Sequence, residues 1–224
     1  MPHFDIVKTC NPSKSFRVSK IQADFDVQPK HADEHFVGDI ELPSEWNIGV
    51  IVGGSGTGKS TIAKEIFGDQ YITGFEYNAA SVIDDMPEKP VDDITRMFYA
   101  VGFGSVPSWL KPYSVLSTGE KMRVDIARAL LDRDFVVFDE FTSVVDRTVA
   151  ETACIAINKA IKRTNKKFIA VSCHYDILDW LQPDWVFDTN TMQSFFETSL
   201  AHKNSSISEN VGEASGQNLG VIII

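Results

Sequence analysis

The chain has 224 residues, of which 43% are hydrophobic and 23% are charged, and its formal net charge is −10. This length suits one large domain, or one domain with a small appendage, and the composition supports a globular core. The acidic balance argues against a broad, sequence-blind nucleic-acid surface, because such binding depends on neutralising phosphates. Nucleic-acid binding through a local basic patch at 159–167 stays open, although we interpret that patch as a solvated helix face.

The cysteines and the apolar segments indicate a cellular compartment. Cys10, Cys154 and Cys173 have no metal-ligand spacing and are odd in number, which is typical of reduced thiols. No stretch approaches the roughly 20 apolar residues that cross a bilayer, and the start of the chain lacks a signal-peptide pattern. We therefore expect a cytoplasmic protein that does not itself insert into a membrane.

The N-terminal quarter is expected to form β-structure. Short apolar bursts at 16–18, 21–27 and 36–42 predict an antiparallel layer with turns at 11–12 and 29–30. The apolar run at 47–52 then predicts a buried strand, which enters a glycine-rich turn and a helix from Ser60 to Phe67.

The remainder of the chain predicts an α/β domain. Residues 71–116 form a mixed, short helical arm with one helix at 92–100. Helices at 117–131 and 147–161 then alternate with apolar strands at 135–138 and 168–171, a pattern typical of a mainly parallel sheet flanked by helices. We expect one domain over 1–198 and a disordered polar tail over 199–224.

A phosphate-binding loop follows the strand at 47–52. The segment GGSGTGKS, residues 53–60, fits the P-loop pattern G-x-x-x-x-G-K-[ST] between a strand and a helix. Its glycines let backbone N–H groups converge on phosphate oxygens, next to the positive end of the helix dipole. The expected ATP contacts are Gly53, Ser55, Gly56, Thr57, Gly58, Lys59, Ser60 and Thr61. Of these, Lys59 reaches the β- and γ-phosphates, Ser60 ligates Mg²⁺, and Thr61 lies near the α-phosphate.

Two carboxylates follow the second apolar strand, in the segment FVVFDE. Ligands of parallel sheets gather at the carboxyl ends of the strands, where the phosphate loop also lies. Asp139 is therefore expected to hold Mg²⁺, and Glu140 to orient or deprotonate the attacking water.

The segment LSTGE begins the next helix. Ser117 and Glu120 have the spacing of a capping box, which alone would explain them. The same helix N-terminus, with a hydroxyl and the backbone of Gly119, is also suited to binding an anion.

Over roughly residues 14–188, the chain resembles the ATP-binding-cassette (ABC) ATPases. The resemblance rests on the phosphate loop, the LSTGE signature, the FVVFDE strand, the segment SVVD at 143–146 and His174, in that order. It implies a head-to-tail homodimer that forms on ATP binding and holds two ATP molecules, with Mg²⁺, between each phosphate loop and the opposing signature. In this arrangement Lys59, Glu140 and His174 are catalytic, with His174 contacting the γ-phosphate as a switch. The signature residues Ser117, Gly119 and Glu120 face the ATP of the other copy, and Asp146 bridges the interface.

The resemblance also implies an aromatic residue that stacks on adenine. Phe25 lies 28 residues before Gly53, about where the family places this residue. Phe16 and Phe36 compete with it for the role.

The chain departs from the family in its signature and its glutamine loop. Thr118 replaces the first signature glycine, and Glu120 stands where glutamine is common. Gln70 comes too early for the family's magnesium-linked glutamine, so Asp84, or its neighbour Asp85, becomes a candidate metal ligand.

These departures favour a soluble, ATP-dependent dimerising clamp or switch that acts on an unidentified macromolecular partner. The alternative is the nucleotide-binding subunit of an ABC transporter. A third reading, a regulatory protein that binds ATP but scarcely hydrolyses it, is disfavoured by the presence of Glu140 and His174.

Overall fold

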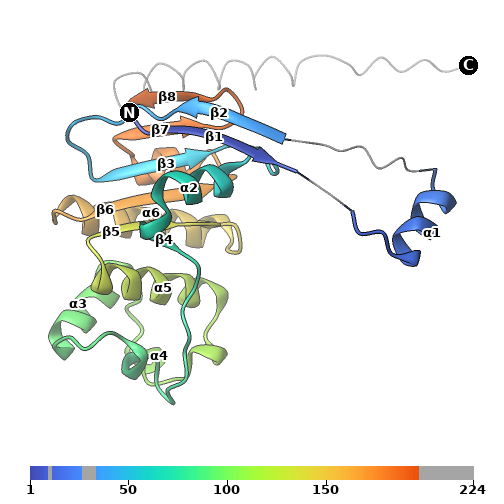
Figure 1. Ribbon diagram of the computed structural model, residues 1–224. Coiled ribbons are helices and arrows are strands. Elements are labelled where there is room, and N and C mark those ends of the chain that lie inside the picture. The colour runs from blue at the N-terminus through green and yellow to red at the C-terminus, as the bar shows by residue number, and fades with distance from the viewer. Residues whose placement is uncertain (10–11, 27–33, 197–224) are drawn as a thin grey trace, which may run out of the picture.

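The computed structural model describes residues 1–9, 12–26 and 34–196, and it has an α/β architecture (Figure 1). Its main sheet has the strand order β4-β5-β6-β3-β7-β8, in which β8 alone runs antiparallel to its neighbour. The strands are β3 (Ile48–Val52), β4 (Tyr71–Ile72), β5 (Phe135–Phe138), β6 (Lys167–Ser172), β7 (Trp185–Asp188) and β8 (Gln193–Phe196). The predicted mainly parallel sheet is confirmed.

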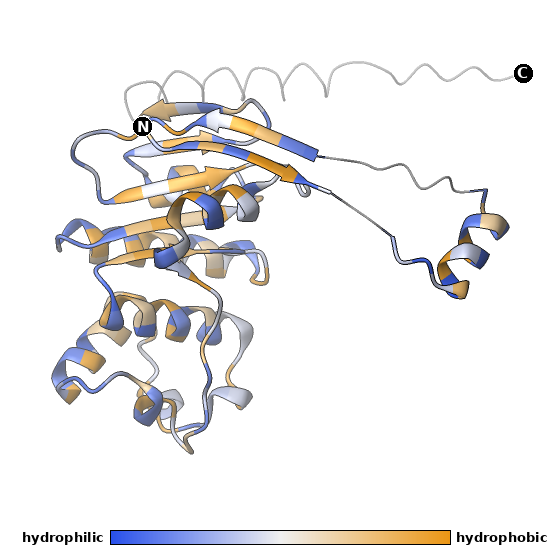
Figure 2. Ribbon diagram, in the orientation of Figure 1, coloured by the Kyte–Doolittle hydropathy of each residue, from blue (hydrophilic) through white to orange (hydrophobic). Residues whose placement is uncertain are grey.

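Two apolar clusters cover the two faces of this sheet, and the alternation along β3 separates them. Val50 and Val52 pack with α3, α5, α6 and α7, whereas Ile51 packs with α2 and with the small N-terminal sheet. The helices are α2 (Lys59–Phe67), α3 (Val91–Ala100), α5 (Thr118–Asp132), α6 (Arg147–Lys162) and α7 (Ile177–Leu181). Figure 2 shows the apolar residues concentrated on the strands, as expected for a sheet buried on both sides.

The predicted antiparallel layer is present, but its strands differ from those expected. It consists of β1 (His3–Lys8) paired with β2 (Glu34–Asp39). The strands predicted at 16–18 and 21–27 are wrong, because the described part of this segment forms helix α1 (Phe16–Asp24). The side chain of Ser15 caps this helix by accepting the N–H of Val18. In so short a stretch, apolar residues at 16, 18 and 21 fit both the hydrophobic period of a strand and that of a helix.

The helical arm packs against one end of α5. It contains α3, α4 (Val106–Trp109) and the short 3-10 turns η2 (Val82–Asp85) and η3 (Tyr113–Val115); another such turn, η1 (Gly68–Gln70), follows α2. Trp109 is buried and donates its indole N–H to the carbonyl of Phe103, at 2.8 Å. The aromatic segment before the signature therefore forms the core of the arm.

The central elements agree with the sequence analysis to within a residue or two at each end. The helix predicted at 92–100 is α3, and the elements predicted at 117–131, 135–138, 147–161 and 168–171 are α5, β5, α6 and β6. The strands β1, β7 and β8 were not predicted, and the tail at 199–224 lies outside the described residues. Among the described helices, none is both long and apolar enough to cross a membrane.

Candidate active site

Three neighbouring strands carry the predicted site residues to the same edge of the sheet. The order β5-β6-β3 and the parallel registers align the carboxyl ends of these strands. The phosphate loop follows β3, Asp139 and Glu140 follow β5, and His174 follows β6. This is the edge at which ligands of open α/β sheets bind.

The glycines of the phosphate loop are required by its shape. Gly56 and Gly58 have φ values of 82° and 85°, in the left-handed region that glycine adopts readily. A Cβ atom at Gly53 would lie 2.1 Å from the hydroxyl of Thr189, and one at Gly58 would lie 2.7 Å from the ring of Phe36. Gly58 caps α2, so the positive end of this helix opens directly onto the loop.

Internal hydrogen bonds hold the loop in this shape. The Lys59 ammonium donates to the carbonyl of Gly54 at 2.6 Å, and the Thr57 hydroxyl donates to the same carbonyl at 2.9 Å. The side-chain carbonyl of Asn190 accepts the N–H of Gly54 at 3.2 Å, and the hydroxyls of Thr57 and Thr189 are 2.6 Å apart. The remaining predicted contacts of the loop, Ser55 and Thr61, lie at its exposed tip and in the first turn of α2.

Sequence reasoning missed Thr189 and Asn190. They follow β7, which pairs with β3 on the side away from β6. The apolar run WVFD at 185–188 ends at the same edge as the phosphate loop, and it was the available signal for these two residues.

Glu140 is held in a fixed position beside Asp139. Its backbone has a positive φ of 51°, and its N–H donates to a carboxylate oxygen of Asp139 at 2.9 Å. The Ser143 hydroxyl lies 2.7 Å from the Glu140 carboxylate. Glu140 is exposed, so its carboxylate can reach a water molecule at the sheet edge.

Tyr71 links the two predicted magnesium ligands. Its hydroxyl donates a hydrogen bond to the carboxylate of Asp139, and the hydroxyl of Ser60 lies close enough to lower the pKa of the phenol. Burial, followed by the hydrogen bond to Asp139, raises the pKa of Tyr71 above its ordinary value. The phenol therefore stays protonated at neutral pH and acts as a donor.

The oxygen donors at this point fit a magnesium ion. Ser60 supplies a hydroxyl and Asp139 a carboxylate, and both lie within reach of a single phenol oxygen. Mg²⁺ prefers oxygen ligands and binds ATP sites through one or two protein groups, phosphates and water. Ser60 and Asp139 are thus suited to hold the ion.

Asp84 does not share this location. It is exposed on η2, where the N–H of Val82 bonds to the carbonyl of Lys111 in the arm. Asp85, the neighbouring candidate, accepts the backbone N–H groups of Asn78 and Ala79. The recess beside Asp139 is lined by Tyr71, Thr73, Gly74 and Asp125, among others, and not by Asp84.

The signature forms the predicted capping box at the start of α5. Ser117 accepts the N–H of Glu120 at 3.3 Å, and the Glu120 carboxylate accepts the N–H of Ser117 at 2.9 Å. Burial alone would raise the pKa of Glu120, but the hydrogen bonds from Ser117 lower it below its ordinary value. Ser117 is exposed, which leaves this helix N-terminus accessible to an anion.

Asp146 and His174 are also placed near the sheet edge. Asp146 is exposed and caps α6 by accepting the N–H of Val149 at 3.0 Å. The backbone N–H of His174 donates to the hydroxyl of Ser172 at 3.1 Å. Within the described part of the chain, the imidazole of His174 makes no hydrogen bond or ion pair, so it can still meet a ligand.

The structure does not bring Phe25 to the phosphate loop. Phe25 caps the C-terminus of α1 and is 70% exposed, and α1 stands apart from both sheets in Figure 1. Phe16 lies on the same helix, whereas the ring of Phe36 packs against Gly58. The strand placement of Phe25 was wrong, and adenine stacking by Phe25 stays a prediction that this arrangement does not support.

Known proteins similar to this chain are ABC cassettes. The human iron-sulfur clusters transporter ABCB7, mitochondrial, is 30% identical over 173 residues, covering 58% of this chain and 23% of that protein. The energy-coupling factor transporter ATP-binding protein EcfA1 from Staphylococcus aureus (strain USA300) is 28% identical over 180 residues, covering 62% of this chain and 66% of that protein. No protein-family model matches the chain.

Solved structures give the same result for the fold. The dimeric structure of MJ0796, a bacterial ABC transporter cassette, matches with a TM-score of 0.57 at 14% identity, covering 83% of this chain and 92% of that one. The same cassette, in a post-hydrolysis state bound to ADP and Pi, matches with the same TM-score at 13% identity. The predicted resemblance is therefore confirmed: the relatives and the structural neighbours are ABC ATPase cassettes, and the fold is that of this class of P-loop proteins.

Proposed function

We propose that this chain hydrolyses ATP at a composite site that two copies form by closing head to tail on two molecules of Mg·ATP. The observation that carries the proposal is the meeting of the phosphate loop, Asp139, Glu140 and His174 at one sheet edge. The signature helix offers the exposed Ser117, whose described contacts include no residue of the phosphate loop of the same chain. A second copy can therefore supply the missing half of the site.

The phosphate loop binds the triphosphate. Its backbone N–H groups and the N-terminus of α2 face the phosphate oxygens. Lys59 leaves the carbonyl of Gly54 and reaches the β- and γ-phosphates. With ATP bound, the N–H of Gly54 no longer needs the side-chain oxygen of Asn190 as its acceptor. The side chains of Ser60 and Asp139 hold the magnesium ion, which neutralises charge on the β- and γ-phosphate oxygens when it is bound.

Glu140 orients the attacking water. Its carboxylate is exposed at the sheet edge and is fixed by the hydroxyl of Ser143, so its position is set before the nucleotide arrives. It accepts a hydrogen bond from the water while His174, which follows the neighbouring strand β6, contacts the γ-phosphate. Ser117 and the N-terminus of α5 from the second copy then stabilise the charge on the transferred phosphoryl group.

A complementation experiment tests the composite site. Ser117→Arg blocks the signature, and Glu140→Gln disables the water-orienting group, so each variant alone should bind Mg·ATP but turn over very slowly. In a mixed dimer, one site combines the intact Glu140 of the first variant with the intact Ser117 of the second. We expect mixing to restore part of the ATPase activity.

The matched control mixes Ser117→Arg with the double variant Ser117→Arg/Glu140→Gln, which should restore nothing. If Ser117→Arg alone hydrolyses ATP at the normal rate, the proposal that two copies share each site is contradicted. It is equally contradicted if the first mixture stays inactive although both variants bind ATP.

Two roles for this ATPase were predicted, and they receive different support. Both relatives described above are named as transporter proteins, which supports a nucleotide-binding subunit of an ABC transporter. The soluble clamp keeps one specific observation, namely that among the described residues a tyrosine, Tyr71, and not a glutamine donates to Asp139. We favour the transporter role on the relatives.

Fractionation of the source cells distinguishes these roles. A transporter subunit should sediment with membranes and be recovered with a multi-span protein after detergent extraction. Recovery of the chain in the soluble fraction alone would favour the clamp.

A further inference from the structure

We propose that Tyr71 is a positioning residue of the magnesium site, and that its hydroxyl takes the place of the magnesium-linked glutamine that the family's glutamine loop carries. The inference rests on the ATPase function proposed above. Its first support is location: the hydroxyl contacts both Asp139 and Ser60, which are the two protein groups suited to hold the ion.

The fold fixes this hydroxyl in place. Tyr71 begins β4 and pairs with Val137, two residues before Asp139 on the neighbouring strand. Its side chain is only 8% exposed, and the Lys64 ammonium of α2 lies 4.9 Å from the centre of its ring. Since α2 also carries Ser60, the phenol is held between the two elements that supply the ligands.

The alternatives are placed elsewhere. Asp85 is engaged with the backbone of Asn78 and Ala79, and Asp84 is exposed on the arm. Gln70 lies in η1, before β4 begins. Among the residues that line the recess beside Asp139, Tyr71 is the one whose described contacts join the two ligands.

A tyrosine in this position has a defined chemical role. Its protonated hydroxyl donates to one carboxylate oxygen of Asp139, and the other oxygen accepts the N–H of Glu140, so both contacts together orient the carboxylate. With the ion in place, the hydroxyl remains a hydrogen-bond partner for the carboxylate or for a water of the ion. Outer-shell partners of this kind typically contribute about 10- to 100-fold to metal affinity.

The test measures metal dependence of nucleotide binding, which does not depend on turnover. ATP affinity is measured by calorimetry with EDTA and with Mg²⁺, and Mn²⁺ binding to the ATP complex is followed by electron paramagnetic resonance. For Tyr71→Phe we expect unchanged ATP affinity in EDTA and about a 10-fold loss of the gain in affinity that the metal produces. Tyr113→Phe is the matched control, because it removes a phenol hydroxyl from another aspartate, Asp125, and should leave metal dependence unchanged.

Either of two results would overturn the inference. One is metal dependence in Tyr71→Phe equal to that of the unaltered protein. The other is tighter metal binding, which would mean that the hydroxyl only blocks the site. If the unaltered protein fails to bind ATP at all, the proposed function fails instead, so the two failures are distinguishable.

A second feature, independent of the nucleotide site, is an apolar groove of about 790 Å³ on the opposite edge of the sheet. It is lined by α3 and by the C-terminal parts of α5 and α6, which return the chain to the amino ends of β5 and β6. Its apolar lining includes Met97, Ala100, Leu130, Leu131, Ile155 and Ala156. Ile155 is 38% exposed, so the groove opens to solvent.

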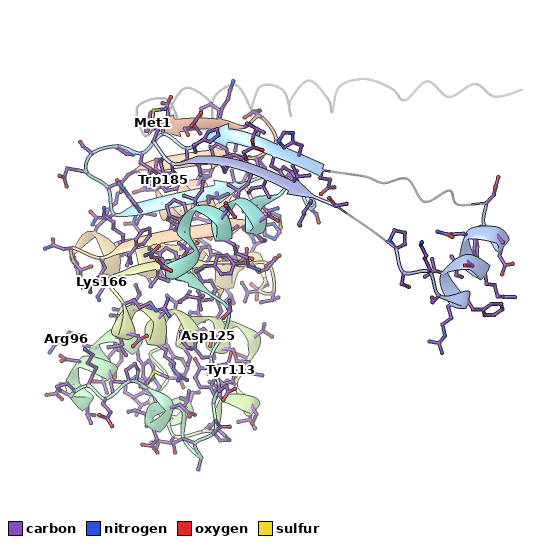
Figure 3. The ribbon with its side chains drawn as sticks, viewed as in Figure 1. Met1, Arg96, Tyr113, Asp125, Lys166 and Trp185 are labelled. Carbon is purple, nitrogen blue, oxygen red and sulfur yellow. The ribbon has the colours of Figure 1, made fainter. Side chains whose placement is uncertain are left out.

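The rim of this groove is basic although the chain is acidic overall. Among the described residues that line it, Asp93 is the one acidic residue, and five are cationic: Lys89, Arg96, Lys159, Arg163 and Lys166. Arg96 pairs with Asp93, and Lys166 pairs with Asp134. Within the described residues, Lys159 and Arg163 form no ion pair. Arg96 and Lys166 are labelled on the same side of the molecule in Figure 3.

The geometry points to an amphipathic helix of a partner protein, with acidic residues beside its apolar face, as the occupant of this groove. The apolar floor matches the helix-in-groove mode, and the unpaired cations favour acidic side chains at its borders. A nucleic acid fits less well, because its phosphates would gain the rim cations but leave the apolar floor uncovered.

Synthetic peptides test this assignment. A fluorescein-labelled Leu/Glu amphipathic helix should bind the full chain, and a Leu/Lys helix of the same pattern should not. Lys159→Glu/Arg163→Glu and Ile155→Asp should each weaken binding of the acidic peptide at least 10-fold while leaving ATP affinity unchanged. Lys162→Glu is the matched control, because Lys162 lies on α6 but does not line the groove. Equal binding of both peptides, or preferential binding of a duplex oligonucleotide, would overturn the assignment.

Discussion

Gly119 is required for the packing of two helices, in addition to its expected role in the signature. A Cβ atom at this position would lie 2.8 Å from Cγ1 of Val149 on α6, closer than real side chains approach. The glycine therefore allows α5 and α6 to pack closely, whatever its backbone contributes to ATP. This packing role could not be predicted from the LSTGE segment, because Val149 lies thirty residues further along the chain.

Gly119→Ala should therefore destabilise the monomer. We expect a loss of about 1–3 kcal/mol, the usual cost of inserting a methyl group into a packed contact. Urea denaturation without nucleotide measures this directly. Gly119→Ala/Val149→Ala should recover most of the loss, and an unchanged midpoint in Gly119→Ala would contradict the packing role.

The residues of the site differ in how directly a sequence motif identifies them. The phosphate loop, Asp139 and Glu140 were predictable because each belongs to a short pattern in a fixed strand context. Tyr71, Thr189 and Asn190 were not, since they reach the site through the pairing of β4 with β5 and of β7 with β3. The strand placement of Phe25 was wrong for a local reason, namely that the Ser15 cap starts a helix where strands were expected.

At the scale of elements, the half-buried carboxylate of Asp125 links α5 to the loop that carries Tyr77 and to η3. Asp125 accepts hydrogen bonds from Tyr77 at 2.7 Å and from Tyr113 at 2.9 Å, and the two rings stack with centroids 3.8 Å apart. Tyr113 and Asp125 are labelled close together in Figure 3. Burial raises the pKa of Asp125 above its ordinary value, so this carboxylate depends on its donors.

Removing one donor should be costly. Tyr113→Phe leaves the half-buried Asp125 with one phenol donor fewer, and we expect a loss of about 1–3 kcal/mol of unfolding free energy. The same substitution in an Asp125→Asn background should cost less, because the charge is gone. Equal losses in both backgrounds, measured by urea denaturation, would contradict a contribution from the charge of Asp125.

The capping box of α5 predicts a dependence of stability on pH. Because the folded-state pKa of Glu120 lies below its ordinary value of 4.5, its ionised form stabilises the folded state. This stabilisation is complete above the unfolded pKa and is lost as the pH falls through the folded pKa. Unfolding free energies of the unaltered protein and of Glu120→Gln should therefore converge at low pH; a constant difference across the range would contradict the ionised cap.

Long, uniformly apolar or well-capped elements were the predictable ones. Strands β5 and β6 and helices α5 and α6 each have a hydrophobic pattern that fits one type of element clearly. Strands β1 and β8 carry mixed residues at the edges of sheets, so their identity depends on the strands with which they pair: β1 pairs with β2, and β8 with β7. The 3-10 turns of the arm lack any period that a sequence pattern could reveal.

At the scale of the whole molecule, the two proposed binding sites lie at opposite ends of the parallel strands. The proposed nucleotide site lies at the carboxyl ends of the parallel strands, and the apolar groove with its basic rim lies at their amino ends. Both α5 and α6 run from one edge to the other, beginning at the signature and at Asp146 and ending at the groove. Whatever occupies the groove therefore contacts the same helices that a second copy would meet at the nucleotide.

The solution mass of Glu140→Gln with and without Mg·ATP, by light scattering after size exclusion, tests the central claim most directly. The single chain has a mass of 24.9 kDa, and blocked hydrolysis should trap the closed pair. We predict a shift to about twice this mass on adding Mg·ATP, and no shift with EDTA or in Glu140→Gln/Ser117→Arg. A mass that stays monomeric while ATP is demonstrably bound would contradict the shared site between two copies of this chain.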